Sequence, residues 1–230
     1  MKKIFISFFI LSIFTYLLLS CSDTTPSIIT VHPALIYEYS AINSKPVERL
    51  SVFVQPNTEV ERFLKMEIEN LNTGFTWTIY EPDIIESGTR SFVGSPVLMP
   101  YEKQEFPFGE YKLTYTDVAS RSVVKKFILK KPASFEKNPI HKLAYKDIDS
   151  KKVAKDFIFD RVVLYDENGE IIFYGGQKRE FLIIEEVRKY YPEARVMRKY
   201  RMVNDNSCGI LLAPIYLPEY INKDEEIEED

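Results

Sequence analysis

The fold class is decided by the stretch PFGEYKLTYTD, residues 107–117. Within it Tyr111, Leu113 and Tyr115 alternate with polar residues, which is the two-residue period of a β-strand with one buried face. Turn-forming residues follow at 117–122, and residues 123–130 are again rich in valine, isoleucine and phenylalanine. The stretch therefore predicts a β-hairpin with one face directed toward a core.

The chain before this hairpin carries the same period. Strands are expected at 28–39, 49–55, 64–69 and 75–79, with a turn at 70–74. Pro33 removes a hydrogen-bond donor from the first of these strands, so we expect an edge strand or a bent one. Trp77 is interpreted as a core residue, with a ligand-stacking ring as the alternative. Residues 82–100 contain several glycines and prolines and are predicted to be irregular.

The spacing Pro-x-Gly-x-Tyr-x-Leu-x-Tyr-x-Asp at 107–117 resembles the last hairpin of immunoglobulin-like and fibronectin-like modules. In such modules the tyrosine commonly fixes a corner of the sandwich. The resemblance covers residues 28–132 and implies an immunoglobulin-like β-sandwich there. It implies no activity, because this fold serves many functions.

Residues 133–222 are predicted to form a small α+β unit made of a hairpin, a helix and a second hairpin. Its expected elements are a short helix to residue 156, strands at 159–165 and 170–174 around an Asp166–Gly169 turn, a helix at 180–191, and strands at 196–203 and 209–217. Asn-Gly is expected to take positive φ at both central positions of the turn. Whether this unit folds alone or packs on the sandwich stays open. Residues 223–230 are predicted to be an acidic, disordered tail, with binding of a basic partner or divalent ions as the alternative.

The first 21 residues form a basic start, an apolar segment and a small residue, which is typical of a secretory signal. The apolar segment, residues 4–19, would be about 24 Å long as a helix, which is short for a membrane span of about 30 Å. Leu18-Leu19-Ser20-Cys21 resembles the lipobox of bacterial lipoproteins. That resemblance implies a signal peptide at 1–20, a lipid such as palmitate on Cys21, and a lipidated tether at 21–27. The alternative is an uncleaved membrane helix followed by a chance cysteine.

Localisation follows from the same resemblance. In enteric lipoproteins an aspartate directly after the lipidated cysteine favours the inner membrane, and here that position is Ser22. We therefore expect a bacterial cell-envelope protein, with the outer membrane favoured over the inner one and with the membrane as partner through Cys21. The net charge of −4 gives no reason to expect nucleic acid as a partner.

Candidate chemical groups are few and scattered along the sequence. His32 and His141 are far apart, and a metal site needs converging ligands, so no metal or cofactor is expected. Cys208 opens an apolar strand and is interpreted as a buried residue, with a nucleophile as the alternative. Asp160, Asp166 and Glu167 are interpreted as ordinary acidic residues, with a glycosidase pair formed by two of them as the alternative. Gly175-Gly176 is interpreted as a loop and not a phosphate site. These residues give no catalytic motif, so an enzyme is not expected.

The sequence therefore favours an anchored, non-catalytic binding or scaffold module for an envelope protein or glycan. Exposed tyrosines are its candidate contacts, because tyrosine offers large contact area at low entropic cost. These are Tyr37, Tyr39, Tyr190 and Tyr191, each of which has a core interpretation as the alternative. An envelope hydrolase with its site in the C-terminal unit is the alternative function, and a small-ligand carrier is a third.

Overall fold

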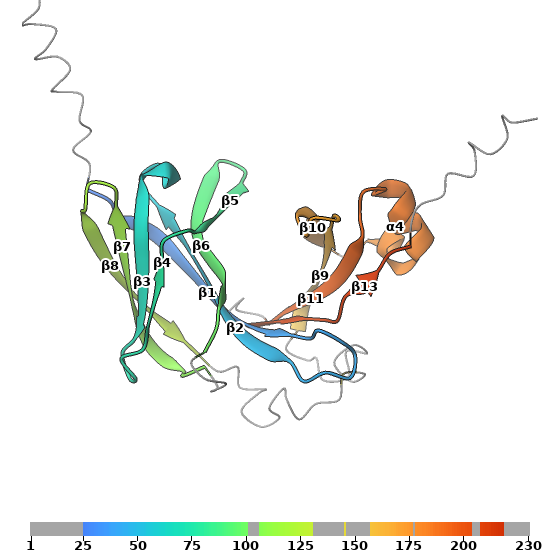
Figure 1. Cartoon of the computed structure of the whole chain (residues 1–230), viewed down its shortest axis with the longest axis horizontal. Coiled ribbons are helices and arrows are strands. Elements are labelled where there is room, and N and C mark those ends of the chain that lie inside the picture. Colours follow the sequence, from blue (N-terminus) through green and yellow to red (C-terminus); the bar gives the residue numbers. More distant parts are fainter. Residues whose placement is uncertain are drawn as a thin grey trace, which may run out of the picture.

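A computed structural model describes residues 25–100, 106–130, 145, 157–176, 178–203 and 208–218 (Figure 1), with the backbone alone at 157–159 and 203. The fold is mainly β, as predicted. The first sheet, sheet A, holds β1 (Ile28–Glu38), β2 (Val47–Pro56), β5 (Asp83–Ser87), β6 (Arg90–Leu98), β9 (Phe157–Tyr165), β10 (Ile171–Gly176), β11 (Val196–Val203), β12 (Cys208–Leu211) and β13 (Ile215–Tyr216). The second, sheet B, holds β3 (Phe63–Asn70), β4 (Thr76–Ile79), β7 (Gly109–Asp117) and β8 (Ser122–Leu129). The helical elements are η1 (Val60–Arg62), η4 (Arg179–Leu182) and α4 (Ile184–Tyr190).

Sheet B packs against one end of sheet A as a β-sandwich. Its strand order is β4-β3-β7-β8, and the order in sheet A is β10-β9-β11-β12-β1-β2-β6-β5, with β13 paired to β11. Figure 1 shows sheet B facing β1, β2 and β6, while β9, β10 and α4 lie at the other end. The predicted hairpin at 107–130 is confirmed as β7 and β8, which pair from Gly109↔Leu129 to Thr116↔Ser122.

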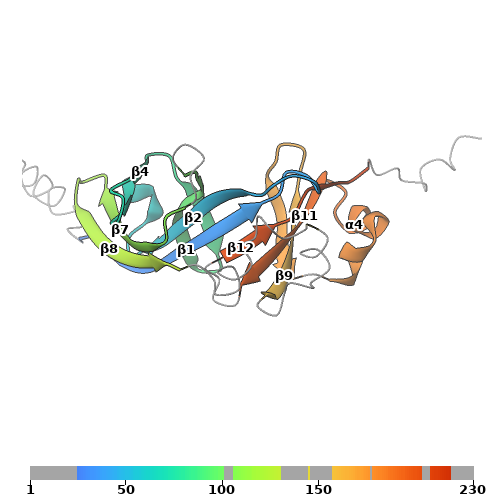
Figure 2. The same ribbon diagram turned by 90° about the horizontal axis from the view of Figure 1, so that it is seen from below.

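The long strand β1 connects the two ends of sheet A. It pairs antiparallel with β2 from Ile28 to Glu38 and parallel with β12 from Leu35 to Glu38, so β1 and β12 lie side by side in Figure 2. Pro33 lies before β12 joins, in the part of β1 that pairs only with β2 among the described strands. The prediction of an edge strand is therefore confirmed only for the part of β1 before Leu35. Sheet A is continuous from the predicted sandwich into the predicted α+β unit, and the boundaries 28–132 and 133–222 remain predictions.

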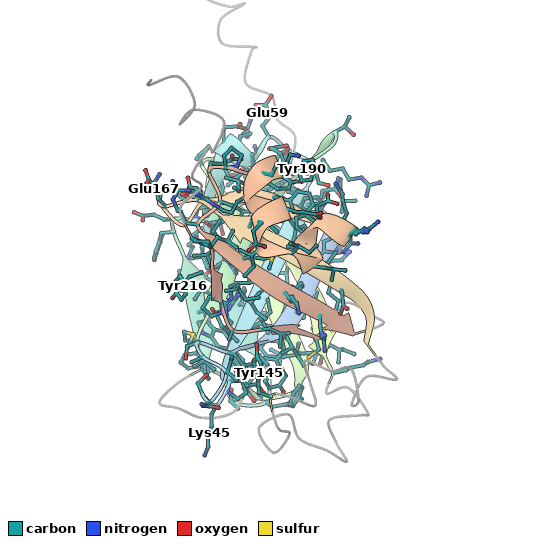
Figure 3. All side chains as sticks on the ribbon, turned by 90° about the vertical axis from the view of Figure 1, so that its right-hand side faces the viewer. Lys45, Glu59, Tyr145, Glu167, Tyr190 and Tyr216 are labelled. Carbon is teal, nitrogen blue, oxygen red and sulfur yellow. The ribbon has the colours of Figure 1, made fainter. Side chains whose placement is uncertain are left out.

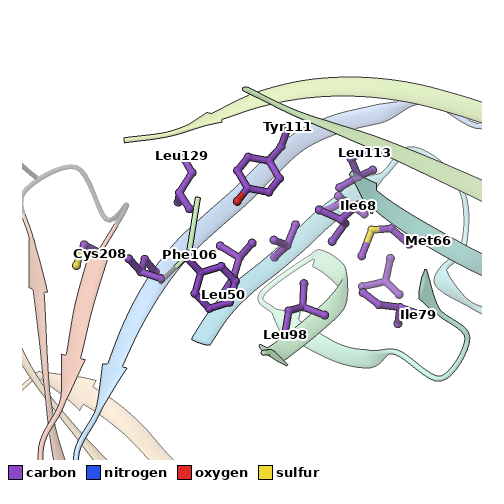
Figure 4. Close-up of a cluster of buried hydrophobic side chains, with 14 of the residues drawn as sticks. Leu50, Met66, Ile68, Ile79, Leu98, Phe106, Tyr111, Leu113, Leu129 and Cys208 are labelled. Atoms are coloured by element: carbon purple, nitrogen blue, oxygen red, sulfur yellow. The ribbon is translucent and has the colours of Figure 1, made fainter. Parts of the chain in front are cut away.

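The core of the sandwich follows the predicted alternation (Figure 4). Tyr111, Leu113 and Tyr115 of β7 have no exposed surface. Met66 and Ile68 of β3 pair with Tyr115 and Leu113, and Figure 4 shows Met66, Ile68 and Leu113 close together. The same cluster also contains residues of β12 and of the segment after it, namely Cys208, Ile210, Leu212 and Ala213. The C-terminal part of the chain therefore completes the core of the N-terminal sandwich, and Cys208 is confirmed as a buried residue.

Buried polar groups fix the loops at one end of the sandwich. The Tyr111 hydroxyl donates to the carbonyl of Pro107 at 2.5 Å, which fixes the segment that leads into β7. The Asn70 side-chain oxygen accepts from the backbone N–H groups of Asn72 and Thr73, each at 3.0 Å, and confirms the predicted turn. Trp77 packs against the core, and its Nε1 donates to the carbonyl of Met99 at 2.7 Å.

Residues 82–100 form the hairpin β5–β6, so the prediction of irregular structure was wrong. Gly88 has φ of +63° and makes the turn between the two strands. A Cβ at Gly94 would lie 2.1 Å from the carbonyl oxygen of Val52 in the neighbouring strand. Glycine here marks a close approach of two backbones, and not the end of a strand.

The predicted helix at 180–191 is two shorter elements, η4 and α4, separated by Ile183 in an extended conformation with φ −125° and ψ 119°. The break has a packing reason. In a continuous helix Phe181 and Val187 would point about 120° apart at 100° per residue. The break lets both side chains enter one second core, which they share with Leu164 and Met197.

Three further expectations need correction. In the Asp166–Gly169 turn only the glycine has positive φ, of +84°, because Asp166 Oδ1 accepts from the N–H groups of Asn168 at 2.9 Å and Glu170 at 2.8 Å. Gly175-Gly176 belongs to β10 and is not a loop. The expected strand at 209–217 is divided by Pro214 into β12 and β13.

Several expectations fall outside the described residues. They are the signal peptide at 1–20, Cys21 with the start of its tether, the short helix before residue 157, His141 and the acidic tail.

Candidate functional site

Three charged side chains meet where the two ends of sheet A join. Glu38 of β1 accepts from Arg49 Nε of β2 at 2.8 Å and from Arg198 Nη1 of β11 at 2.5 Å. The two arginines also donate to backbone carbonyls: Arg49 to that of Pro96, and Arg198 to those of Leu212 at 2.9 Å and Tyr39 at 2.8 Å. The cluster thus connects β1, β2, β6 and β11 through side chains.

The register of sheet A explains why these residues meet. Arg49 pairs with Ile36, and residues two apart on a strand point the same way, so Arg49 and Glu38 share a face. Glu38 pairs with Leu211, which pairs with Tyr200, and Arg198 lies two residues before that tyrosine. The cluster therefore lies on the face of sheet A opposite to the buried side chains of the sandwich.

The electrostatics of the cluster keep its carboxyl group ionised. Burial alone would raise the pKa of Glu38, but the hydrogen bonds and positive charges of Arg198 and Arg49 outweigh it and lower this pKa below its usual value. Both oxygens of Glu38 are engaged by arginines. A carboxylate held in this way is unsuited to act as a general acid near neutral pH.

Tyrosines extend the cluster across β11, β9 and β10. Tyr200 lies so close to Gly209 that a Cβ there would be 2.2 Å from the tyrosine hydroxyl, and burial raises the pKa of Tyr200. Tyr200 pairs with Arg161, whose guanidinium lies 5.9 Å from the centre of the Tyr174 ring. Tyr174 is 53% exposed, so its ring is open to solvent on this face.

We call this surface the arginine–tyrosine face, made of Glu38, Arg49, Arg161, Tyr165, Tyr174, Arg198 and Tyr200. It carries three cations and one anion, but the side chains of Arg49 and Arg198 are only 13% and 12% exposed and hold Glu38, so Tyr174 is the member most open to a ligand. Arginine and tyrosine side chains combine flat contact area with hydrogen-bonding groups, and both are enriched where proteins bind other molecules. The arrangement is suited to recognition of a ligand.

The site residues expected from the sequence are not brought together. Tyr37 and Tyr39 are buried, so they are core residues and not contacts. Tyr190 is 62% exposed and lies at the α4 end of the molecule (Figure 3), where Tyr191 packs against Phe181 and Phe173.

The remaining candidates have local, structural surroundings. His32 lies 2.9 Å from the hydroxyl of Thr30, and its ring meets that of Phe92 edge to face. Asp160 forms an ion pair with Arg201, Asp166 caps its own turn, and Glu167 is exposed. Within the described ranges, no three His, Cys, Asp or Glu residues are grouped so that they could hold a metal ion.

Sequence analysis missed the residues of the arginine–tyrosine face. Glu38 and Arg198 are 160 residues apart, and a charged residue at the end of a strand normally points to solvent. The strand predicted at 196–203 places Arg198 and Tyr200 on one face, because they are two residues apart. This spacing does not identify the residues that they contact.

Comparisons with known proteins give this chain no family. No family model matches it, and neither does any curated protein. Among solved structures, a chain from the complex of the mouse coronavirus receptor-binding domain with its murine receptor aligns with 83% of this chain and 100% of its own length. The identity is 9% and the TM-score 0.13, so the likeness carries no argument. In the part of the chain that the structure describes, no helix is long and apolar enough to cross a membrane.

Proposed function

We propose that this protein is a lipid-anchored lipoprotein of the bacterial cell envelope that binds an envelope protein or glycan without catalysis. The anchor is supported by the lipobox-like residues that end at Cys21. The binding role is supported by one observation, the arginine–tyrosine face, which sheet A assembles from strands distant in the sequence.

The chemistry of this face supports the choice of ligand. The Arg161 guanidinium lies over the exposed Tyr174 ring, so an aromatic surface and a cation are presented side by side. Tyrosine rings stack on apolar and sugar surfaces, and guanidinium groups donate to carboxylates and carbonyls. A polar envelope protein or a glycan with acidic groups would find complementary groups here.

The anchor is tested with Cys21→Ala. We expect the variant to lose labelling by radioactive palmitate and to leave the membrane fraction, because two or more acyl chains are needed for stable anchoring. The wild-type protein and a Cys208→Ala variant are the controls, since Cys208 is buried in β12. Persistent lipid labelling and membrane retention of Cys21→Ala would contradict the anchor.

The binding role is tested by crosslinking the wild-type protein in its own membrane and recovering it by affinity purification. We expect a stoichiometric partner whose recovery falls at least tenfold in Tyr174→Ala. Tyr190→Ala is the matched control, because Tyr190 is similarly exposed, at 62% against 53% for Tyr174, and lies at the α4 end. Recovery of no partner, or equal losses in both variants, would contradict the assignment of this face.

A further inference from the structure

The outermost strand of sheet A, β5, differs from the other edge strands in the described part of the chain. It pairs with β6 along one side, from Asp83↔Gly94 to Ser87↔Arg90, and ends the strand order of the sheet. All five of its residues are exposed. Its two apolar residues, Ile84 and Ile85, are 50% and 46% exposed, so both faces of the strand present an apolar side chain.

An edge strand exposes backbone N–H and C=O groups, and proteins usually protect such edges. Three other edge strands carry protection. In β10 the register shifts between Ile171 and Phe173, β8 carries the exposed Lys125 and Lys126, and β4 has only four residues. By contrast, β5 is five residues long, has no lysine, no proline and no register shift, and its only charged residues are the acids Asp83 and Glu86, which repel an acidic strand but not a basic one. Its backbone is therefore open to pairing with another strand.

The charges around β5 indicate what kind of strand would pair there. Glu81, Asp83 and Glu86 are all exposed and no basic residue lies in β5, and the exposed Arg90 of β6 stands opposite Ser87, at the turn end of the strand. Two copies of β5 in antiparallel pairing would bring four carboxylates into one short strip, and like charges on neighbouring strands are destabilising. A partner strand with basic residues would instead pair opposite charges with these acids.

We propose that β5 is a docking edge, to which a partner protein adds an extended segment of alternating basic and apolar residues as a further strand of sheet A. The backbone of the segment bonds to the free side of β5, which supplies affinity that is independent of sequence. Its apolar residues contact Ile84 and Ile85, and its basic residues lie near the three acids. This edge is separate from the arginine–tyrosine face, so either assignment can fail without the other.

The test uses the full-length chain in detergent and an array of blocked hexapeptides in which lysine alternates with valine. A matched array replaces lysine with glutamate. We expect at least tenfold greater retention on the lysine peptides, a decrease with added salt, and at least threefold slower amide hydrogen exchange in residues 83–87 on binding.

Two variants locate the binding. Ile84→Lys adds to β5 the kind of charge that protects β8, and we expect it to reduce retention at least tenfold. Val124→Lys is the matched control, because Val124 is 54% exposed on the edge strand β8. Equal retention on both arrays, unchanged binding by Ile84→Lys, or a wild-type dimer that Ile84→Lys converts to a monomer would each overturn the proposal.

Discussion

The two hydrophobic cores of this protein depend on the chain in different ways. The core of the sandwich draws on residues from Ile28 to Ala213, and it includes side chains of β12 near the C-terminus. Among the described residues, the second core, under η4 and α4, draws only on side chains between Val162 and Leu217. The C-terminal part thus closes a small core of its own, whereas the N-terminal sandwich is incomplete without β12.

The largest expected effect comes from a change in the shared strand. Ile210 of β12 is fully buried in the sandwich core, so Ile210→Ala should lower the free energy of unfolding by about 3 kcal/mol, through lost burial and a cavity. The fluorescence of Trp77, the single tryptophan, reports on unfolding of the sandwich. The unfolding transition that it follows should occur at a lower denaturant concentration in Ile210→Ala than in the wild-type protein.

The second core supplies the control for that experiment. Val187 of α4 is also fully buried, but it belongs to the second core. Val187→Ala should destabilise the α4 region, as followed by amide exchange of β9 and β11, with a smaller shift of the Trp77 transition than Ile210→Ala causes. Equal shifts of the unfolding transition followed by Trp77 in Ile210→Ala and Val187→Ala would show that the two cores unfold as one unit. The contrast between the cores would then be wrong.

The charged cluster between the cores should have the next largest effect. Glu38→Gln removes the negative charge that holds Arg49 and Arg198 and should cost about 2 kcal/mol of folding stability at pH 7. Because folding lowers the pKa of Glu38 below 4.5, its stabilising contribution is present above pH 4.5 and is lost as the pH falls through the folded value.

Denaturant unfolding at a series of pH values measures this difference. The stability of the wild-type protein should fall toward that of Glu38→Gln as the solution is acidified below pH 4.5. Glu110→Gln is a suitable control, since the ion pair of Glu110 with Lys126, at 3.1 Å, is exposed. A constant gap between wild type and Glu38→Gln at every pH would show that the charge of Glu38 is not the cause.

The smallest of these effects is expected inside the sandwich alone. Tyr111→Phe keeps the buried ring but loses the hydrogen bond to the carbonyl of Pro107, which should cost about 1 kcal/mol. Trp77 fluorescence should report the loss, and amide exchange in β9 and β11 should not change. Tyr190→Phe, at an exposed position, should leave stability as it is.

Local patterns predicted most of the sandwich, because half-buried strands show their two-residue period directly in the sequence. The alternation was confirmed at Met66 and Ile68 and at Tyr111, Leu113 and Tyr115. It was wrong for Leu64, expected on the same face as Met66, which is 42% exposed at the register shift that opens β3. The pattern failed at β5 and β6 for an identifiable reason. Gly94 is required there by the approach of Val52, a neighbour that the local sequence does not reveal.

The candidate site could not be predicted from the sequence, for a related reason. Its residues are brought together only by the parallel pairing of β1 with β12, which places Glu38 beside Leu211, 173 positions later in the chain. The turn at 166–169 and the break at Ile183 show the same limit on a smaller scale. In both, contacts of particular side chains changed the detail of an element whose presence was predicted correctly.

The length of β1 also has a mechanical consequence. Its ladder with β2 runs from Ile28 to Glu38, and antiparallel hydrogen bonds lie across the strand axis. A tension applied at Ile28 along the strand would therefore strain many of these bonds together, and would not open them one after another. Pulling single molecules from that end should give a high rupture force for the first event, followed by loss of the whole sandwich.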